Sequence, residues 1–193
     1  MNAYHILENE TNKQVIERCI LTAVKACDRN QAWQQAVSLV DLSRKRYGVL
    51  TVDIVNAAIA VCARARKMDQ AFSLYGLLID NNISPKPQTF GALMTATAQA
   101  ATESKGWQEA LSVESEMEKN GFKLDLVTYT ALITALGRGG RWEQAEQAFS
   151  RMRRNSIEPN MVTYSALITA FGNGGQWEKV CMSSLNSLTD LKH

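Results

Sequence analysis

The sequence is poor in the residues that form most metal and catalytic centres. Its two histidines, His5 and His193, lie at opposite ends of the 193 residues, and its four cysteines form no CxxC pair. A structural zinc site needs four such ligands close together, and catalysis needs comparable clusters of polar groups or a phosphate loop. We therefore expect no metal, no cofactor, no small-molecule substrate and no catalytic residue, that is, a protein that is not an enzyme.

Long apolar runs and a strong net charge are also missing. No run approaches the roughly 18 apolar residues of a transmembrane helix, and the formal net charge is only +2. We expect no membrane span, and a basic surface could arise only if the cations cluster. Residues 1–14 contain two Glu and no Arg, so they resemble neither a signal peptide nor an organelle transit peptide.

A pattern with a period of about 35 residues runs through the sequence instead. Residues 126–160 begin LVTYTALITALGRGGRWEQA, and the pattern restarts at Met161 as MVTYSALITAFGNGGQWEK. The four tryptophans share one repeat position, which Met68 fills in the remaining repeat, and the gaps between these five residues are 35, 39, 35 and 35 (Trp33, Met68, Trp107, Trp142, Trp177). A fixed period of this length indicates a repeat architecture.

The period divides the chain into six segments. Residues 1–16 are predicted to be an N-terminal extension and 17–51 a degenerate first repeat. Three repeats follow at 52–86, 87–125 and 126–160, and 161–193 is an incomplete fifth. The repeat at 87–125 carries a four-residue insertion, which we place within 98–105. Cys27 and Cys62 occupy one repeat position and are predicted to be small core residues in a reducing compartment.

Each repeat is predicted to be a helical hairpin. The first helix of 126–160 presents one apolar face (Tyr129, Leu132, Ile133, Leu136), and the second presents another (Trp142, Ala145, Ala148, Phe149, Met152). Gly137, Gly139 and Gly140 are expected to end the first helix through the left-handed conformation, and Trp142 to be buried between hairpins. Such helices bury their apolar faces only by stacking, so the fold class is an all-α solenoid of about five hairpins.

The motif VTYxALIxAxGxxGxWExA with a 35-residue period resembles the pentatricopeptide repeat family, in its plain class of 35-residue motifs. The resemblance covers residues 17–193 and is strongest at 126–177. It implies a right-handed α-α superhelix whose first helices bind single-stranded RNA, about one base per repeat. It also implies an adaptor in organelle RNA processing, stability or translation, located in a mitochondrion or chloroplast.

The resemblance also implies which residues contact RNA. Two residues of each repeat would read the base edge, namely the pairs Asn56/Lys86, Gly91/Asp125 and Thr130/Asn160, with Leu21/Thr51 in the first repeat and Ser165 unpaired in the last. Val127 and Val162 match the positions that sandwich each base. The family preferences assign adenine to Thr130/Asn160, whereas Lys86, Leu21 and Gly91 depart from the usual readers.

The same residues also have structural interpretations. Asp125 and Asn160 are expected to cap helices in any helical-hairpin array, Thr130 and Ser165 could be tolerated polar residues on a solvated face, and Val127 and Val162 could be core residues. The basic runs at 44–46 and 151–154 suit the negative ends of second helices. Better candidates for phosphate contact lie on the first helices and the turns after them (Lys25, Arg29, Arg64, Arg66, Arg138, Arg141).

Two functions fit this sequence. The first is the RNA-binding adaptor that the family resemblance implies, with single-stranded RNA as the partner and further proteins of a ribonucleoprotein as additional partners. The alternative is a protein-interaction scaffold, in which the same first helices bind a peptide or a ribonucleoprotein subunit. The low net charge and the unusual pairs favour the scaffold, and the family-like repeats at 126–177 favour RNA.

Overall fold

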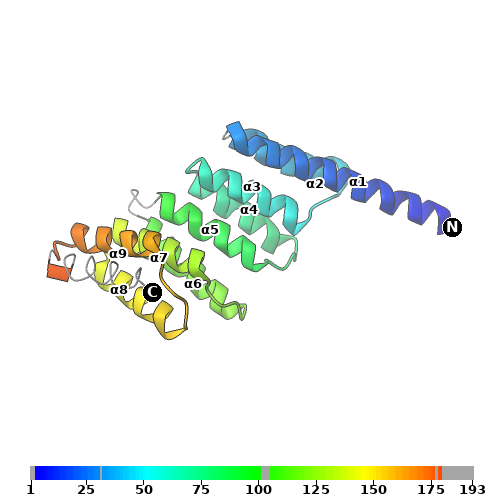
Figure 1. The fold of residues 1–193 in the computed structure, drawn as a ribbon. Coiled ribbons are helices and arrows are strands. Elements are labelled where there is room, and N and C mark those ends of the chain that lie inside the picture. The colour runs from blue at the N-terminus through cyan, green and yellow to red at the C-terminus, as the bar shows by residue number, and fades with distance from the viewer. Residues whose placement is uncertain (1–2, 31, 101–104, 177, 180–193) are drawn as a thin grey trace. The chain divides into compact units, whose positions relative to one another are not determined.

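The computed structural model describes residues 3–30, 32–100, 105–176 and 178–179, and the side chains of 3–11 and 30 are not part of that description. All regular structure in these ranges is helical, and none of these helices is both long and apolar enough to span a membrane. The chain forms two compact units, residues 1–96 and 97–193, whose helices are labelled in Figure 1. The predicted all-α repeat fold is confirmed.

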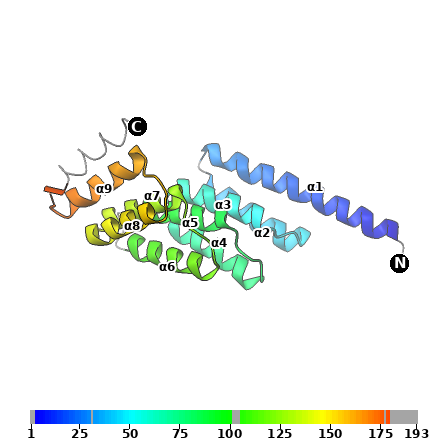
Figure 2. The same cartoon turned by 60° about the horizontal axis from the view of Figure 1, so that its bottom comes forward.

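The first unit contains antiparallel helix pairs joined by short turns (Figures 1 and 2). Its elements are α1 (Ala3–Cys27), η1 (Asp28–Asn30), α2 (Trp33–Tyr47), α3 (Val52–Arg64), α4 (Met68–Asp80) and the first ten residues of α5 (Pro87–Ala100). Helix α3 packs on α1, α2 and α4. Helix α1 continues without a break through residue 17, where the first repeat is predicted to begin.

The second unit contains the end of α5 and four further helices. These are α6 (Gly106–Lys119), α7 (Leu126–Arg138), α8 (Trp142–Arg154) and α9 (Met161–Asn173). Helix α7 packs on α6, α8 and α9, so the first helices of successive repeats are direct neighbours. The predicted insertion lies within 98–105, of which 101–104 are outside the described residues, as are Trp177 and 180–193.

The predicted apolar faces form the cores of the two units. Tyr129, Leu132, Ile133 and Leu136 of α7 are buried, as are Ala145, Ala148 and Met152 of α8. Cys62 is fully buried, and this burial raises the pKa of its thiol to about 11. Cys27 is only half-buried at the end of α1, so the prediction that it is a core residue is wrong. Cys27 is the last residue of α1, which packs on α2 and α3, whereas Cys62 lies within α3, which packs on α1, α2 and α4.

The turn glycines have two different functions. Of Gly137, Gly139 and Gly140, only Gly140 has left-handed backbone, with φ of +70°, as has its equivalent Gly175. Gly137 belongs to α7, and a Cβ there would come within 2.7 Å of the Ala170 Cβ. A Cβ on Gly139 would come within 2.6 Å of Cδ1 of Trp107. The prediction that all three glycines supply left-handed backbone is therefore wrong, because two of them permit close packing.

The tryptophans lie against the turn of the next hairpin. Trp107 contacts Gly139, and Trp142 contacts Gly174 one repeat later. The Arg141 guanidinium lies 4.3 Å from the centre of the Trp107 ring. Because each ring lies at a surface turn, Trp142 is half-buried and not fully buried. The contact nevertheless joins successive hairpins.

A charged contact joins the second helices of the second unit. Arg151 in the last turn of α8 lies 2.7 Å from the Glu114 carboxylate of α6. The Glu114 side chain is 8% exposed, and that of Arg151 is 38% exposed. Burial raises the pKa of Glu114, as does the nearby Glu118, while Arg151 opposes the rise. Arg151 therefore partly compensates the burial of a carboxylate, in addition to its favourable place at a helix C-terminus.

Candidate functional site

Two exposed valines mark the face that the sequence predicts to be functional. Val127 is 62% exposed and Val162 63% exposed, and with Met161 they are the exposed large apolar residues in the described part of the second unit. Each valine is the second residue of a first helix, α7 or α9, and these two helices are packed together. Their exposure rules out the alternative that they are core residues. It leaves two apolar side chains at equivalent places on adjacent helices.

Polar caps precede these valines. The Asp125 carboxylate accepts hydrogen bonds from the Thr128 backbone N–H at 2.8 Å and from the Thr128 hydroxyl at 2.6 Å. The Asn160 side-chain oxygen accepts from the Thr163 backbone N–H at 3.0 Å, and the Asn160 N–H is 3.4 Å from the Thr163 hydroxyl. The predicted helix caps are therefore confirmed. Capping uses only one end of the Asn160 amide, and no described residue accepts a hydrogen bond from its Nδ2.

Thr130 and Asn160 are joined through the hydroxyl of Thr163. Thr130 Oγ1 lies 2.7 Å from Thr163 Oγ1, which lies 3.0 Å from Asn160 Oδ1. Thr130 Oγ1 also donates to the Leu126 carbonyl at 2.8 Å. Thr163 is fully buried, Thr130 is half-buried and Asn160 is exposed. The two predicted readers are thus part of one hydrogen-bonded group, which the repeat pattern alone did not reveal.

The other predicted readers of the second unit are simpler. Ser165 is exposed on α9, one repeat after Thr130, and its carbonyl accepts a hydrogen bond from Thr169. Gly91 belongs to the first unit and Asp125 to the second. A Cβ on Gly91 would meet no atom within 4 Å. The chain therefore has space for a side chain at this position but does not use it.

The predicted pair Asn56/Lys86 lies in one hollow of about 550 Å³ in the first unit. Leu21 and Lys25 of α1 also line it, together with Asp53. The Lys86 Nζ donates to Asp53 at 2.9 Å, and the Asn56 side-chain oxygen is buried without a hydrogen-bond partner. Asp53 occupies the repeat position of Val127 and Val162. Where the second unit has an apolar side chain, the first unit thus has an ion pair.

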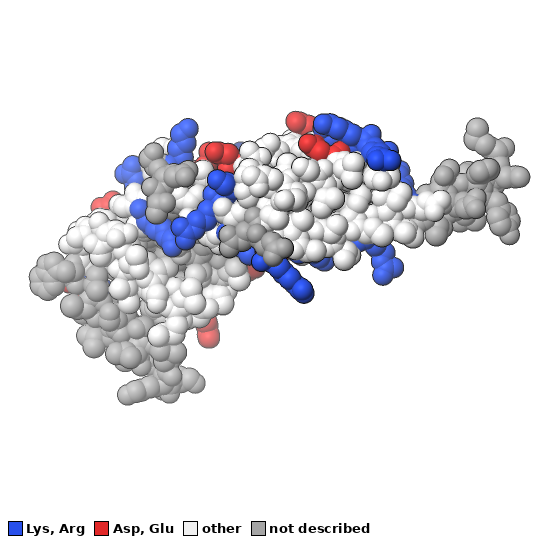
Figure 3. Space-filling model, turned by 90° about the horizontal axis from the view of Figure 1, so that it is seen from above, with Lys and Arg blue, Asp and Glu red and all other residues white. Residues whose placement is uncertain are grey.

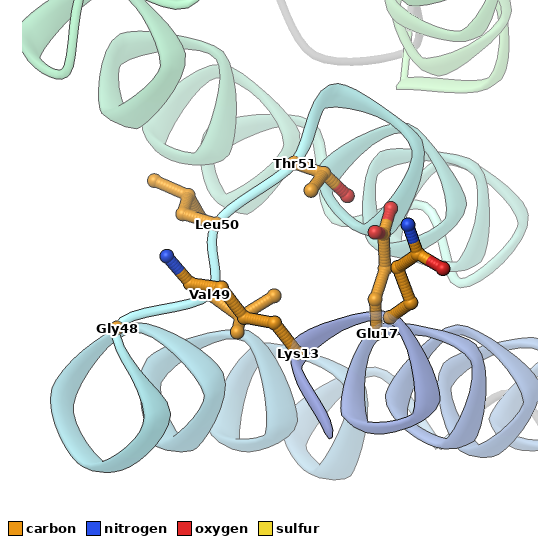
Figure 4. Close-up of a pocket in the computed structure, with 7 residues that line it drawn as sticks. Lys13, Glu17, Gly48, Val49, Leu50 and Thr51 are labelled. Carbon is orange, nitrogen blue, oxygen red and sulfur yellow. The ribbon is translucent and has the colours of Figure 1, made fainter. Parts of the chain in front are cut away.

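Leu21/Thr51 is the predicted pair of the first repeat, and Leu21 lines the same hollow as Asn56 and Lys86. Thr51 lines a different hollow, between α1 and residues 48–51, together with Lys13 and Glu17 (Figure 4). Its hydroxyl is buried without a hydrogen-bond partner and does not cap α3. Leu21 has no polar side-chain atom and the Thr51 hydroxyl has no hydrogen-bond partner, so this pair lacks the hydrogen-bonded link seen between Thr130 and Asn160.

Three of the five arginines among the predicted phosphate contacts make contacts within the protein. Arg64 donates to Asp28, Arg138 donates to the Ala98 carbonyl at 2.6 Å, and Arg141 covers the Trp107 ring. Asn173, at the repeat position of Arg138, likewise donates to the Gly137 carbonyl at 3.0 Å. This position therefore ties each first helix to the end of the preceding one. Arg66 is exposed, with left-handed backbone at φ +57° where other repeats have glycine.

Charge is dispersed over the face that Figure 3 shows. On the face in Figure 3, basic and acidic side chains lie beside one another in small groups, and the described residues form no continuous basic stripe there. Within the described ranges there is also no group of three or more His, Cys, Asp or Glu that could hold a metal ion. The arrangement can therefore contact the flat apolar faces and polar edges of a ligand, with a modest contribution from charge.

Comparisons with known proteins agree with the repeat geometry. A family model described as "Pentatricopeptide repeat domain" matches residues 112–174, and one described as "PPR repeat" matches 53–83. The human protein "Pentatricopeptide repeat-containing protein 1, mitochondrial" is 29% identical over 72 residues, which are 37% of this chain and 10% of that protein. The match thus spans about a tenth of the relative's length.

Solved structures of this family are similar over most of the chain. The PPR domain of Arabidopsis thaliana protein-only RNase P 1, solved in complex with tRNA, gives a TM-score of 0.73 at 21% identity, covering 92% of this chain and 91% of that domain. The maize protein PPR10 gives 0.68 at 27% identity, covering 89% of this chain and 24% of PPR10. PPR10 in complex with an 18-nucleotide psaJ RNA element gives 0.71 at 22% identity, covering 84% and 23%.

The TM-scores show that these structures share the fold of this chain. The sequence motif, the hairpins of both units and the two matching family models all agree. The chain therefore contains pentatricopeptide repeats, which the family models match at 53–83 and 112–174.

Proposed function

We propose that the chain is a non-enzymatic adaptor that binds single-stranded RNA, and that Val127, Thr130, Asn160 and Val162 contact one base. The observation that carries this proposal is the pair of exposed valines on adjacent helices, next to a polar pair with a free amide. Exposed valines are costly unless a ligand covers them. The two flat faces of a base are a suitable ligand, and its edge suits the polar pair.

The donors and acceptors of the polar pair support adenine as the preferred base. The Asn160 Nδ2 offers two donors, and the Thr130 Oγ1 retains a lone pair. Adenine presents an amino group beside a ring-nitrogen acceptor on its Watson–Crick edge, so one hydrogen bond can form in each direction. RNA in the structures of PPR10 and of the RNase P domain is further support for this ligand class.

The small number of base contacts implies a modest affinity for RNA. Stacking contributes about 1–3 kcal/mol per base, and one repeat has a complete set of contacts. Arg66 and the partly engaged Arg64, Arg138 and Arg141 are the proposed phosphate contacts, so binding should weaken as salt rises. We further propose a role in organelle RNA processing, stability or translation, in a mitochondrion or chloroplast. The name of the human relative supports the mitochondrion.

Titration of the chain with short single-stranded RNAs that differ at one nucleotide, at two salt concentrations, tests the proposal. We expect binding that weakens with salt, favours adenine at one position and is weaker for duplex RNA of the same sequence. Absence of binding at low salt, together with specific co-purification of a protein partner, would refute it and support a protein-interaction scaffold. The Asp53–Lys86 ion pair at a predicted base position is the observation that favours that alternative.

A further inference from the structure

We infer that Thr163 is a positioning residue that sets the base specificity of Thr130 and Asn160. This inference rests on the proposed function and adds a third residue, one that does not touch the base. The Thr163 side chain is fully buried, and its hydroxyl lies 2.7 Å from Thr130 Oγ1 and 3.0 Å from Asn160 Oδ1. It is the atom through which the two readers are connected.

The hydroxyl of Thr163 fixes which end of the Asn160 amide faces outward. Asn160 Oδ1 receives the Thr163 backbone N–H and approaches the Thr163 hydroxyl, so two groups of the same residue hold it. An amide with its oxygen held in this way must present Nδ2 on its other side. Asn160 therefore faces a ligand as a donor, and rotation of the amide to present an acceptor would break both contacts.

The same hydroxyl also determines what Thr130 can offer. Thr130 has one hydroxyl proton and two neighbouring acceptors, the Leu126 carbonyl at 2.8 Å and Thr163 Oγ1. If Thr163 donates to Asn160, the Thr130 proton goes to Thr163 or to Leu126. If Thr163 donates to Thr130, that proton goes to Leu126. In every case the proton stays inside the protein, so Thr130 presents an acceptor to a ligand.

The preceding repeat provides a natural comparison. Thr128 is the equivalent residue of α7, is also buried, and makes the same two contacts with its cap, Asp125. The repeat position of Thr130 is there occupied by Gly91, which has no side chain to connect. Thr128 can therefore act as a capping residue but not as a link between two readers. A comparison of the two threonines therefore distinguishes the effect of helix capping from an effect on base specificity.

The experiment compares Thr163→Val with Thr128→Val in the full chain. Both variants keep the side-chain shape and lose one capping hydroxyl, so we expect similar drops in melting temperature. Binding is measured with four RNAs that differ at the nucleotide for which the wild type discriminates. Loss of an oriented hydrogen bond should reduce that discrimination by about fivefold in Thr163→Val. Thr128→Val should keep it, and Thr163→Ser should restore it.

The outcomes separate this inference from the proposed function. If the wild type discriminates and Thr163→Val discriminates equally well, Thr163 is a capping residue only and the inference is wrong, while the proposed function stands. If the wild type binds RNA with equal affinity for all four bases, the proposed reading pair is wrong and the inference fails with it. A further measurement is ¹⁵N relaxation of the Asn160 side-chain amide in the RNA-free protein. If this amide is as ordered in Thr163→Val as in the wild type, the inference is also wrong.

Discussion

Asn160 caps a helix and, in our proposal, also contacts RNA. The equivalent cap one repeat earlier is Asp125, a residue with different hydrogen-bonding groups. Both Asn160 and Asp125 cap a first helix through one side-chain oxygen. They differ in the second polar atom, which is a neutral donor in Asn160 and a carboxylate oxygen in Asp125. The cap accounts for one end of each side chain, and the proposed ligand contact depends on the other.

This difference predicts the effect of Asn160→Asp. Aspartate caps helices about as well as asparagine and favours the positive end of the helix dipole, so the free energy of unfolding should change by less than about 0.5 kcal/mol. RNA affinity should fall by about tenfold, because a donor is lost and a negative charge is added near the phosphates. Urea denaturation and RNA titration measure the two effects. A large loss of stability with unchanged RNA affinity would contradict the assignment.

The contact between Arg151 and Glu114 should make the stability of the protein depend on pH. The pKa of Glu114 is raised, so the folded protein holds that proton more tightly than the unfolded chain does. Glu114 therefore contributes most to the free energy of unfolding at acid pH. This contribution is lost as the pH rises from the pKa of an ordinary glutamate through the raised pKa of Glu114 in the folded protein. Arg151→Ala removes the group that opposes the rise, so the penalty at neutral pH should increase.

We expect Arg151→Ala to lower the free energy of unfolding at pH 7 by about 1–2 kcal/mol. This is less than for a fully buried pair, because the Arg151 side chain is 38% exposed. The loss should be smaller at pH 5, and Glu114→Gln should remove its pH dependence. Arg153→Ala, an exposed neighbour in the same helix end, is the control and should change stability little. Equal losses for both variants at both pH values would contradict this account.

At the scale of the elements, successive hairpins pack so closely that some turn positions have no room for a Cβ atom. At Gly139 a Cβ would come within 2.6 Å of the Trp107 ring, whereas at Gly172 in α9 it would meet nothing within 4 Å. Gly139→Ala should therefore destabilise the protein by about 1–3 kcal/mol. Gly172→Ala should be neutral or slightly stabilising, because alanine favours the helix. Thermal unfolding of the two variants measures this difference in stability. Equal effects would show that the tryptophan contact does not constrain the turn.

The sequence alone predicts the individual helices better than the joints between them. Period, apolar spacing and caps are local properties, so Trp142, Asp125 and Asn160 are correctly assigned to helix starts. The contacts of Gly139 with Trp107 and of Arg138 with the Ala98 carbonyl join residues 32 and 40 positions apart. No local pattern distinguishes a glycine needed for space from one needed for backbone conformation, which explains the misassignment of Gly137 and Gly139.

The candidate site was predictable in part for the same reason. Repeat position alone identifies Val127, Thr130, Asn160 and Val162, because the family resemblance depends on those positions. The pairing of Lys86 with Asp53 and the role of Thr163 depend on which atoms meet after packing. Repeat position therefore indicates which residues can read a base, and the packed helices determine which of them are available to do so.

In the whole molecule, the two units differ in what their first helices present. The second unit has the exposed Val127 and Val162, whereas the equivalent place in α3 has the ion-paired Asp53. RNA binding should therefore depend on the second unit. Val127→Asp in the full chain should weaken RNA binding by about tenfold, because it replaces an apolar base contact by a charge.

Val15→Asp is the matched control for this prediction. Val15 is also an exposed valine in a helix, at 55% exposure, and lies in α1 outside the predicted base positions. The substitution changes the net charge equally, so any general electrostatic effect on RNA binding should appear in both variants. Equal losses in the two variants would assign the effect to net charge and contradict a specific contact at Val127.

Methyl NMR spectroscopy of the intact chain during titration with a short adenine-containing single-stranded RNA tests the central claim most directly. A base between Val127 and Val162 would shift the methyl signals of both valines through its ring current, and the buried Val113 of the same unit serves as the internal reference. Saturable shifts at Val127 and Val162, with Val113 unchanged, are the predicted result. RNA binding that leaves both exposed valines unshifted would contradict the account.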